Sequence, residues 1–327
     1  MFHKFSRILL LLFVILIFGC NAGNSGLYKI TIKNKTGFIN KKGDVKIDPL
    51  FEAAGDFSEG LALVVIDGKG GYINTKGELS IAADYEKGSS FHEGLAMVVK
   101  DNKCGYINTK GEIVIPFQYD RAGDFHEKQA SVVEGDRHFY INKKNEETIS
   151  GDWTYAGDFH ESMARVSRDG KTGFINRKGE EVIPVVYDFT GDFSDGLALA
   201  VIDDQGGYID SKNRYVIEPQ FKYSKNFSEG KALVLIDEKG GFINKKGEVL
   251  VSPQFIYAGD FSQGLALAKI DKTIGFIDDK GKFVIDPQFD HADSFHDGLA
   301  LVIEDGIVHY INRNGEKVWS YQTPEEE

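Results

Sequence analysis

Hydrophobic and polar residues alternate along this chain in short segments that are separated by tight-turn residues. One unit contains an apolar run over residues 61–66, a turn over 67–70, Gly-Tyr-Ile-Asn over 71–74, a Lys-Gly turn over 76–77 and a further short run over 78–81. The runs are rich in β-branched and aromatic residues, and the Asp-Gly and Lys-Gly pairs supply the positive φ that tight hairpins require. No helical stripe follows the N-terminal segment. The pattern therefore predicts about three short strands in each unit, followed by an ordered loop.

This unit recurs every 34 residues. Glycine followed by Phe or Tyr, then Ile, then Asn or Asp, occurs seven times on this step, and variants that begin with Phe139 and His309 occupy the two remaining places. The isoleucine is the same in all nine units, from Ile39 to Ile311. A fixed period of this length is typical of a repeat architecture. We therefore predict an array of nine units over residues 27–320.

Aromatic residues follow the same period. The chain contains 24 Phe and 14 Tyr but only 2 Trp, and most of these rings fall in three columns that begin at Phe38, Phe51 and Phe57. A column of alanines begins at Ala62. Large rings repeated at fixed positions would form a continuous core between neighbouring units. We assign these columns to packing rather than to ligand binding.

Two arrangements are compatible with nine such units. The predicted fold class is all-β, with three-stranded units stacked as an open β-hairpin solenoid, and the alternative is a closed β-propeller. Thirty-four residues are few for a four-stranded blade, which typically needs about 40. Leu27 aligns with Leu61, and Val318 aligns with Val284, so neither terminus offers a spare strand to the unit at the other end. Both observations favour the open stack.

The first twenty residues resemble a bacterial lipoprotein signal. Lys4 and Arg7 precede an apolar run over residues 8–18, which is too short to span a bilayer but suits a signal-peptide core. The segment Ile-Phe-Gly-Cys that ends at Cys20 resembles a lipobox, at which the cysteine receives a diacylglyceryl group and the chain is cut before it. An ordinary signal peptide or an uncleaved anchor are the alternatives.

These features divide the chain into four parts. We expect a signal peptide over 1–19, a lipidated cysteine and tether over 20–26, the repeat array over 27–320 and an acidic tail over 321–327. The expected location is the cell envelope, where a lipid anchor would hold the protein at the outer membrane or cell surface. The formal net charge of −12, without a basic cluster, argues against a nucleic-acid partner.

The repeat resembles the bacterial WG (KWG-like) repeat. The shared pattern is Gly-Leu-Ala-x-Val, Gly-Tyr/Phe-Ile-Asn/Asp-x-Lys-Gly, Val/Ile-Ile-x-Pro-x-Phe and Phe-Ser-Glu-Gly, and it is clearest over residues 230–264. The tryptophan that names that family is absent from every unit. Its place is held by Thr36, Gly70, Cys104, His138, Thr172, Gly206, Gly240, Ile274 and Val308. The resemblance implies a repetitive all-β protein, often exported, that has no catalytic residues to carry over.

One column combines histidines with neighbouring acids. His92, His126 and His160 occupy the same position in three successive units, next to an acidic column that begins at Glu59. Imidazoles beside carboxylates could bind a divalent metal if neighbouring units bring them together. Serine, as at Ser58, replaces histidine in other units, which favours a role in the turn. We therefore predict no metal site and no cofactor.

Enzymatic chemistry has no clear candidate in the sequence. Nucleophile, phosphate-loop, Cys-x-x-Cys and zinc-protease motifs are absent, and Cys104 is expected to be a small buried residue. We predict no catalytic residue and no enzymatic activity. The predicted function is a lipid-anchored, non-catalytic binding or adhesion scaffold for a protein or cell-surface glycan partner. A propeller-type envelope enzyme with a central site and a passive structural spacer are the alternatives.

Residues that depart from the repeat gather in the third to fifth units. Lys128, Arg137, Trp153 and Arg165 belong to this group. A repeat protein with a non-uniform function would express it where its units differ. We therefore predict a recognition patch at these four residues.

Overall fold

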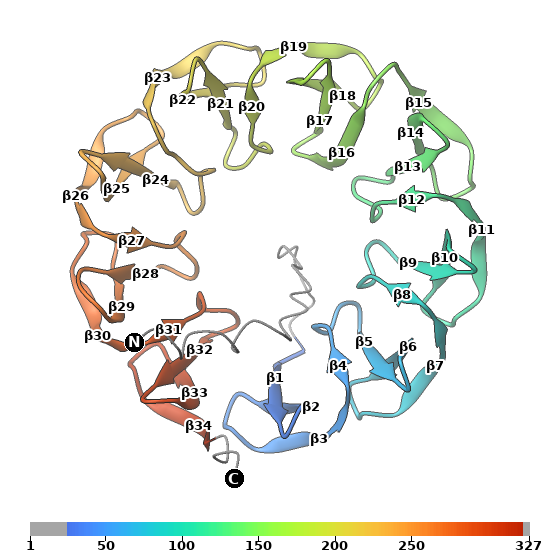
Figure 1. The fold of residues 1–327 in the computed structure, drawn as a ribbon, viewed down its shortest axis with the longest axis horizontal. Coiled ribbons are helices and arrows are strands. Elements are labelled where there is room, and N and C mark those ends of the chain that lie inside the picture. Colours follow the sequence, from blue (N-terminus) through green and yellow to red (C-terminus); the bar gives the residue numbers. More distant parts are fainter. Residues whose placement is uncertain (1–24, 323–327) are drawn as a thin grey trace, which may run out of the picture.

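The structure, a computed structural model, describes residues 25–322, and every regular element in this part of the chain is a β-strand. The strands form nine small sheets that close into a ring, a nine-bladed β-propeller (Figure 1). Within the described residues, no helix has the length and apolar character needed to cross a membrane. The all-β prediction is confirmed, and the closed propeller that was its alternative is the correct arrangement.

Each complete blade has an inner, a second, a third and an outer strand, paired antiparallel in that order. The inner strands are β4 (Ala53–Ala54), β8 (Lys87–Gly88), β12 (Arg121–Ala122), β16 (Tyr155–His160), β20 (Phe189–Thr190), β27 (Tyr257–Ala258) and β31 (His291–Ala292). The second strands are β1 (Leu27–Ile32), β5 (Leu61–Ile66), β9 (Leu95–Lys100), β13 (Ala130–Glu134), β17 (Met163–Arg168), β21 (Ala198–Ile202), β24 (Lys231–Ile236), β28 (Ala266–Lys269) and β32 (Leu299–Glu304).

The third and outer strands complete each blade, and most outer strands have seven residues. The third strands are β2 (Lys35–Asn40), β6 (Lys69–Asn74), β10 (Lys103–Asn108), β14 (Arg137–Ile141), β18 (Lys171–Asn176), β22 (Gln205–Ile209), β25 (Lys239–Asn244), β29 (Ile274–Ile277) and β33 (Ile307–Asn312). The outer strands are β3 (Val45–Phe51), β7 (Leu79–Tyr85), β11 (Ile113–Tyr119), β15 (Glu147–Ser150), β19 (Glu181–Tyr187), β23 (Tyr215–Phe221), β26 (Val249–Phe255), β30 (Phe283–Phe289) and β34 (Lys317–Gln322).

We number the blades 1 to 9 in chain order. Blade 1 consists of β1, β2 and β3 and has no inner strand among the described residues. In blade 7, which contains β24, β25 and β26, the inner strand is reduced to a single bridge between Ser224 and Val234. The last strand ends at Gln322, so the expected acidic tail over 321–327 begins inside β34, and its remainder lies outside the described residues.

The prediction of an open solenoid is wrong because the inner strand needs very little chain. In blade 2 it contains only Ala53 and Ala54, which pair with Val65 and Val64. Two residues are enough to complete a four-stranded blade, so a 34-residue unit fits a propeller. The loops that follow the inner strands project into the centre of the ring (Figure 1).

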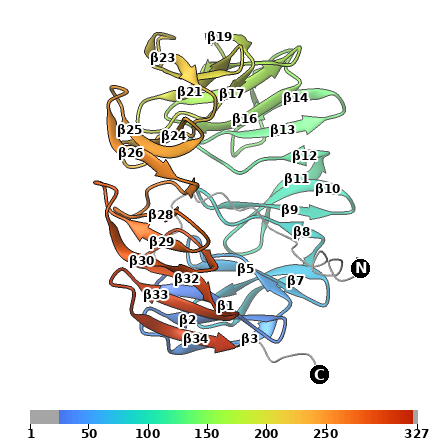
Figure 2. The same ribbon diagram turned by 60° about the vertical axis from the view of Figure 1, so that its left-hand side comes forward.

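The ring also closes without any exchange of strands. Blades 9 and 1 lie side by side, and their contact is a buried cluster that contains Tyr28, Ile30, Leu299 and Tyr310 (Figure 2). The rings of Tyr28 and Tyr310 lie 5.8 Å apart. The absence of a spare terminal strand therefore did not argue against closure, because side chains join the two blades.

The same aromatic contact holds neighbouring blades together around the rest of the ring. The ring on each third strand packs edge-on or tilted against the marker phenylalanine of the next blade, at 4.7–5.0 Å between centroids. Phe38 and Phe57 form the first such pair, and Phe276 and Phe295 form the last. This confirms the assignment of these columns to packing. Within residues 25–322, the nine buried clusters lie between Leu27 and Trp319.

Candidate functional site

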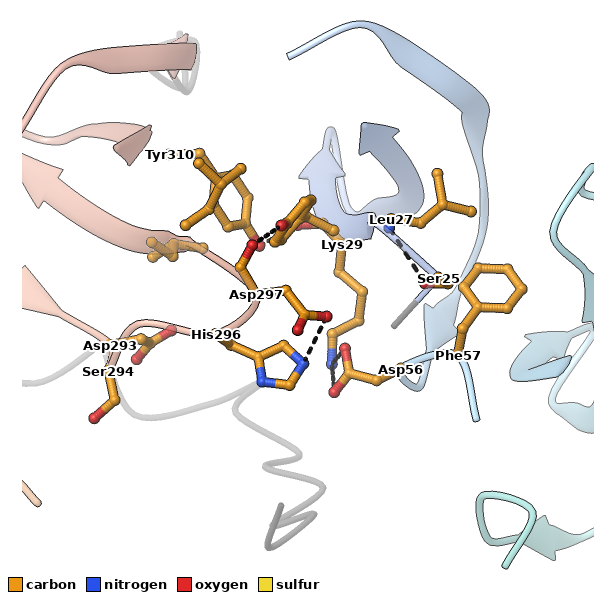
Figure 3. Close-up of a pocket in the computed structure, with 13 residues that line it drawn as sticks. Ser25, Leu27, Lys29, Asp56, Phe57, Asp293, Ser294, His296, Asp297 and Tyr310 are labelled. Atoms are coloured by element: carbon orange, nitrogen blue, oxygen red, sulfur yellow. Dashed lines mark hydrogen bonds and ion pairs between the residues drawn. The ribbon is translucent and has the colours of Figure 1, made fainter. Parts of the chain in front are cut away.

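A cavity of about 200 Å³ lies where the ring closes, beside the place that an inner strand would occupy in blade 1 (Figure 3). The Lys29 ammonium pairs with the Asp56 carboxylate at 3.2 Å, and the His296 imidazole lies 3.5 Å from the carboxylate of Asp297. The Tyr28 hydroxyl donates to the Asp297 carbonyl at 2.6 Å. The charged groups of this cavity are thus already paired with one another, as expected for a joint between blades.

Burial and charge also disfavour ionisation of the tyrosines at this joint. Partial burial, with a smaller contribution from the charge of Asp297, raises the pKa of Tyr28 to about 12. Burial also raises the pKa of Tyr310. Both phenols therefore stay protonated and able to donate hydrogen bonds over the whole neutral range. Their role is structural, because both hydroxyls donate to backbone carbonyls across the joint between blades 9 and 1.

The central turns form a chain of hydrogen bonds that links successive blades. An acidic or amide side chain at each turn accepts a backbone N–H of the next turn at 2.7–3.1 Å, as the Glu59 carboxylate does from Gly94. The Ser58 hydroxyl donates to the carbonyl of Phe91, also in the next blade. These bonds confirm that the serine and acid columns are turn residues.

The three histidines of successive units stack along these turns. The ring centroids of His92 and His126 lie 5.1 Å apart, and those of His126 and His160 lie 5.6 Å apart. Burial, together with the positive charge that the two neighbouring imidazoles can carry, lowers the pKa of His126. Within residues 25–322, no three His, Cys, Asp or Glu side chains are grouped so that they could hold a metal ion. The three imidazoles therefore pack against one another along the central turns.

The four residues of the predicted recognition patch lie on different elements. Lys128 is exposed at a central turn, where its backbone N–H donates to Glu93. Arg137 begins β14, forms an ion pair with Glu147 at 2.9 Å and covers the ring of Phe139. Trp153 is buried, with only 7% of its surface exposed, and packs on Tyr140. The structure therefore places Trp153 in the core.

Arg165 has a different setting. Its guanidinium lies between two exposed aromatic rings, 5.4 Å from the centroid of Tyr155 and 5.7 Å from that of Phe189. One of its N–H groups donates to the carbonyl of Thr190 at 2.8 Å, and Asp192 lies 3.7 Å away. The polar contacts with Thr190 and Asp192 therefore hold the Arg165 guanidinium in an orientation that packs against the rings of Tyr155 and Phe189.

Tyr155 and Phe189 begin a row of exposed aromatic residues that sequence reasoning missed. The first position of the inner strand is aromatic in blades 5 to 8, and the four side chains are 43–53% exposed: Tyr155, Phe189, Tyr223 and Tyr257. We call these four residues the aromatic arc. The other complete blades carry Ala53, Lys87, Arg121 and His291 at this position. The sequence signal for the aromatic arc is the change from small or basic residues to aromatic residues at one repeat position. The exposure of these side chains depends on the inner strand, which the sequence pattern did not predict.

Acidic residues surround the end of the ring that carries the aromatic arc. In blades 2 to 9 the turn between the second and third strands exposes an aspartate, as at Asp203. The backbone N–H of Asp203 donates to Asp188, the residue before Phe189. The aspartates of this set are Asp67, Asp101, Asp136, Asp169, Asp203, Asp237, Asp271 and Asp305. The Lys171 ammonium lowers the pKa of the Asp188 carboxyl, chiefly by hydrogen bonding. A Lys or Arg follows the aspartate within two residues in most of these turns, so the border of the apolar patch carries both charges.

A second cavity, of about 250 Å³, lies between blades 4 and 5. Its lining includes Arg121, Ser131, His138, Tyr155 and Asp158. His138 occupies one of the places where the tryptophan would stand in the repeat that this sequence resembles. The cavity falls within the units that depart most from the repeat, although it is lined by different residues from the four of the predicted patch.

Neither cysteine forms a site of its own in the described residues. Cys104 is buried and free, and burial raises the pKa of its thiol, so it is a poor nucleophile at neutral pH. This agrees with its expected role as a small buried residue. Cys20, the predicted lipidation site, lies outside the described residues, as do the predicted signal peptide and most of the tether.

Comparison with protein-family models gives one match. A model described as "WG containing repeat" matches eight consecutive segments, residues 37–69, 71–104, 105–137, 139–171, 173–205, 207–239, 241–273 and 274–306. No curated protein matched the sequence.

Solved structures with a similar fold share little sequence with this chain. A structure described as a eukaryotic initiation factor is 10% identical with a TM-score of 0.63, and the match covers 92% of this chain and 96% of the other. A dihydro-heme d1 dehydrogenase, NirN, is 10% identical with a TM-score of 0.50, and that match covers 93% of this chain and 74% of the other. At this identity the likeness concerns the fold alone.

Proposed function

Because the chain belongs to the WG-containing repeat family, we propose that it is a non-catalytic binding scaffold that engages a protein partner. A lipid on Cys20 would hold it in the cell envelope, at the outer membrane or cell surface. The proposal rests on one observation above others, the aromatic arc of Tyr155, Phe189, Tyr223 and Tyr257. Four large rings exposed side by side on consecutive blades are costly to leave in water and are typical of an interface.

The chemistry of the arc favours a protein partner. Tyrosine and arginine are the residues that most often dominate binding energy at protein interfaces, and Arg165 is held between the first two rings. The aspartates and the neighbouring basic residues of the border suit a partner surface that carries both charges around an apolar centre. A glycan partner would also stack on aromatic rings, but it has no need of these charges.

The geometry of the ring agrees with attachment through Cys20. Gly26 occupies the repeat position of Gly60, in the central turns, so the chain enters β1 at the end of the blades opposite to the aromatic arc. Between Cys20 and Ser25 the chain can reach at most about 18 Å. A lipid on Cys20 would keep that end near the membrane and leave the aromatic arc facing away from it.

Crosslinking on intact cells tests the proposal. A variant with Phe189→Ser, Tyr223→Ser and Tyr257→Ser should lose a partner that the wild-type protein captures, with an affinity reduced by about 100-fold or more. The matched control replaces three equally exposed apolar residues of the outer strands, Leu79→Ser, Ile113→Ser and Val249→Ser, and should keep the partner.

The alternatives predict other results in the same experiment. A passive spacer captures no partner with either protein. Equal capture by both variants would contradict the aromatic arc as the binding surface. Release of the partner by polysaccharide digestion, and not by protease, would identify a glycan instead. Unmodified Cys20 in the purified protein would contradict the lipid anchor without bearing on the arc.

A further inference from the structure

The cavity between blades 4 and 5 exists because one residue of the repeat is too small. The residue at the position of Ser131 is leucine or methionine in six of the nine blades: Leu63, Met97, Leu199, Leu233, Leu267 and Leu301. In blade 2, Leu63 reaches the inner strand of the next blade, where its Cδ1 lies 3.1 Å from the position that a Cβ would take at Gly88. A serine at this position cannot reach that far, so the space stays open.

The next gap around the ring shows how the same space is otherwise filled. Arg165 has the repeat position of Ser131 in blade 5, and its guanidinium occupies the gap between Tyr155 and Phe189. The repeat position of Ser131 is thus occupied by a large side chain in both neighbouring blades, Met97 in blade 3 and Arg165 in blade 5. The cavity of about 250 Å³ is a local feature of blade 4, and it is too small for a drug-sized ligand but large enough for one small polar molecule.

Several polar side chains line this cavity without a hydrogen-bond partner among the described residues. Within residues 25–322, the side chains of Arg121, Ser131 and His138 form no hydrogen bond or ion pair, and the Tyr155 hydroxyl forms no hydrogen bond. The Asp158 carboxyl accepts no hydrogen bond in the same range, and the His126 imidazole lies 3.8 Å from it. Polar groups that converge on one cavity without partners leave donors and acceptors free for a ligand.

The two ends of the cavity differ in charge. The Asp158 carboxyl lies at one end, with its Oδ1 2.8 Å from the position that a Cβ would take at Gly123. Burial, and then the charges of Asp124 and Asp192, raise the pKa of Asp158 to about 7, so a cation bound at this end would favour the ionised form of the carboxyl. Arg121 is exposed at the first position of β12, two residues before Gly123, and burial followed by the charge of this guanidinium lowers the pKa of His138. This second end would favour an anion. A ligand that fits must therefore carry both charges.

We propose that this cavity binds one free α-amino acid, with its carboxylate at Arg121, its ammonium at Asp158 and its side chain against the ring of Tyr155. The Ser131 hydroxyl and the His138 imidazole are placed to hydrogen-bond the ligand between these ends. A simple neutral sugar would leave Arg121 and Asp158 without partners of opposite charge, and a divalent cation would leave Arg121 opposed to it. The site shares Tyr155 with the aromatic arc but needs none of Phe189, Tyr223 or Tyr257, the residues that the partner test replaces, so the two proposals can fail independently.

Calorimetry on the purified protein tests the proposal. The probes are the twenty standard L-amino acids, each at up to about 10 mM, and for any that binds, its N-acetyl and carboxamide derivatives. We expect at least one amino acid to bind saturably. Each derivative lacks one of the two charges and should bind at least about tenfold more weakly.

Two substitutions at one position provide the matched control. Ser131→Leu restores the residue of the other blades and fills the cavity, so it should reduce the affinity more than tenfold while keeping or raising the melting temperature. Ser131→Ala keeps the cavity open and should change the affinity less than about threefold. If Ser131→Leu fails to fold, Arg121→Ala, at an exposed residue, should weaken binding about tenfold instead.

Three outcomes would overturn the proposal. The first is that none of the twenty amino acids binds. The second is that Ser131→Leu or Arg121→Ala binds as tightly as the wild type. The third is that a derivative without one charge binds as well as its parent, since the recognition would then not depend on the charges at the two ends.

Discussion

The hydroxyl of Tyr310, in blade 9, donates a hydrogen bond to the carbonyl of Lys29, in blade 1, at 2.7 Å. In blade 2 the carbonyl at the same repeat position, that of Leu63, instead accepts the backbone N–H of Gly55, which follows the inner strand. Blade 1 has no inner strand among the described residues, so its exposed carbonyl is satisfied by a side chain from the last blade. One tyrosine thereby compensates for the missing strand at the point where the ring closes.

Replacing Tyr310 by phenylalanine should therefore loosen the closure. Phenylalanine stands at this repeat position in other blades, as at Phe38 and Phe276, so the ring itself will fit. We expect the free energy of unfolding to fall by about 1 kcal/mol, since one hydrogen bond is lost. Hydrogen exchange measured by mass spectrometry should become faster in β1 and β32, the strands that meet at the closure.

Tyr208→Phe is the matched control for this prediction. The Tyr208 hydroxyl donates to the carbonyl of Lys225 in the next blade at 2.6 Å, well away from the closure. Its removal should cost a similar free energy without changing exchange in β1. Unchanged exchange in β1 for Tyr310→Phe would mean that the apolar cluster alone keeps the ring closed.

The sequence predicts the strands and their contacts better than it predicts how the units are arranged. The columns that contain Phe38 and Phe57 are visible in the sequence as aromatic residues that recur every 34 positions. They recur because each blade buries a large ring at the same place against its neighbour. The inner strand leaves almost no trace, since Ala53 and Ala54 form only two residues of ladder. Ring closure depends on the contact between Tyr28 and Tyr310. Tyr310 looks like an ordinary member of its column, and Tyr28 replaces the alanine of the other units without indicating which residue it contacts.

The candidate sites show the same limit. Trp153 was predicted to belong to a recognition patch because tryptophan is rare in this chain. It also stands at a repeat position that is aromatic in eight units. In the structure it is buried like the other rings of that column and packs against Tyr140. Ser131 looks like a harmless replacement of leucine until the neighbouring blade is in place. The cavity that it leaves depends on Tyr155 and Asp158, which lie more than twenty residues further along the chain. Contacts of this kind follow from the ring and not from any local pattern.

A glycine on the third strand should resist substitution because the outer strand folds over it. A Cβ at Gly241 would lie 2.7 Å from the carbonyl oxygen of Val251 and 3.0 Å from the backbone of Pro253, where β26 bulges. In blade 4 the corresponding residue is Phe139, and it pairs with Ser150 without a register shift between it and the next pair. The glycine thus permits the bulge.

We expect Gly241→Ala to reduce the free energy of unfolding by about 2–3 kcal/mol, because the backbone of β26 must move. The control is Gly240→Ala. A Cβ there would first meet the Cδ1 of Leu233 at 3.3 Å, which is the end of a side chain that can shift. Its cost should be below about 1 kcal/mol in the same urea titration. Equal costs would contradict the role of the bulge.

The hydrogen bonds between central turns should tolerate an amide but not an apolar side chain. The Glu161 carboxylate accepts the backbone N–H of Gly196 at 2.9 Å. At the equivalent position Gln263 accepts the N–H of Gly298 at 2.8 Å, which shows that an amide oxygen has the right reach. Glu161→Ala should lower the free energy of unfolding by about 0.5–1 kcal/mol, and Glu161→Gln should cost clearly less. Identical denaturation curves for the two variants would contradict this role.

The Asp158 carboxyl should make the ring less stable as the pH rises. Its pKa is raised from 3.8 to about 7 in the folded protein, chiefly by burial and then by the charges of Asp124 and Asp192. Between these two pH values the unfolded chain has released this proton and the folded chain still holds it, so unfolding releases a proton and the free energy of unfolding falls with pH. The stabilising contribution is present below about pH 4 and is lost as the pH rises through about 7.

Asp158→Asn removes this titration, and Asn226 shows that the repeat accepts asparagine at this position. We expect the variant to be more stable than the wild type at pH 8, by about 1 kcal/mol or more, and the difference to shrink toward pH 4. The control is Asp188→Asn, because the hydrogen bond from Lys171 lowers the pKa of Asp188. Its loss should destabilise the protein at neutral pH and matter less in acid, which is the opposite trend. Urea titrations at each pH give both differences, and a constant difference between Asp158→Asn and the wild type from pH 4 to 8 would show that Asp158 is not the titrating group.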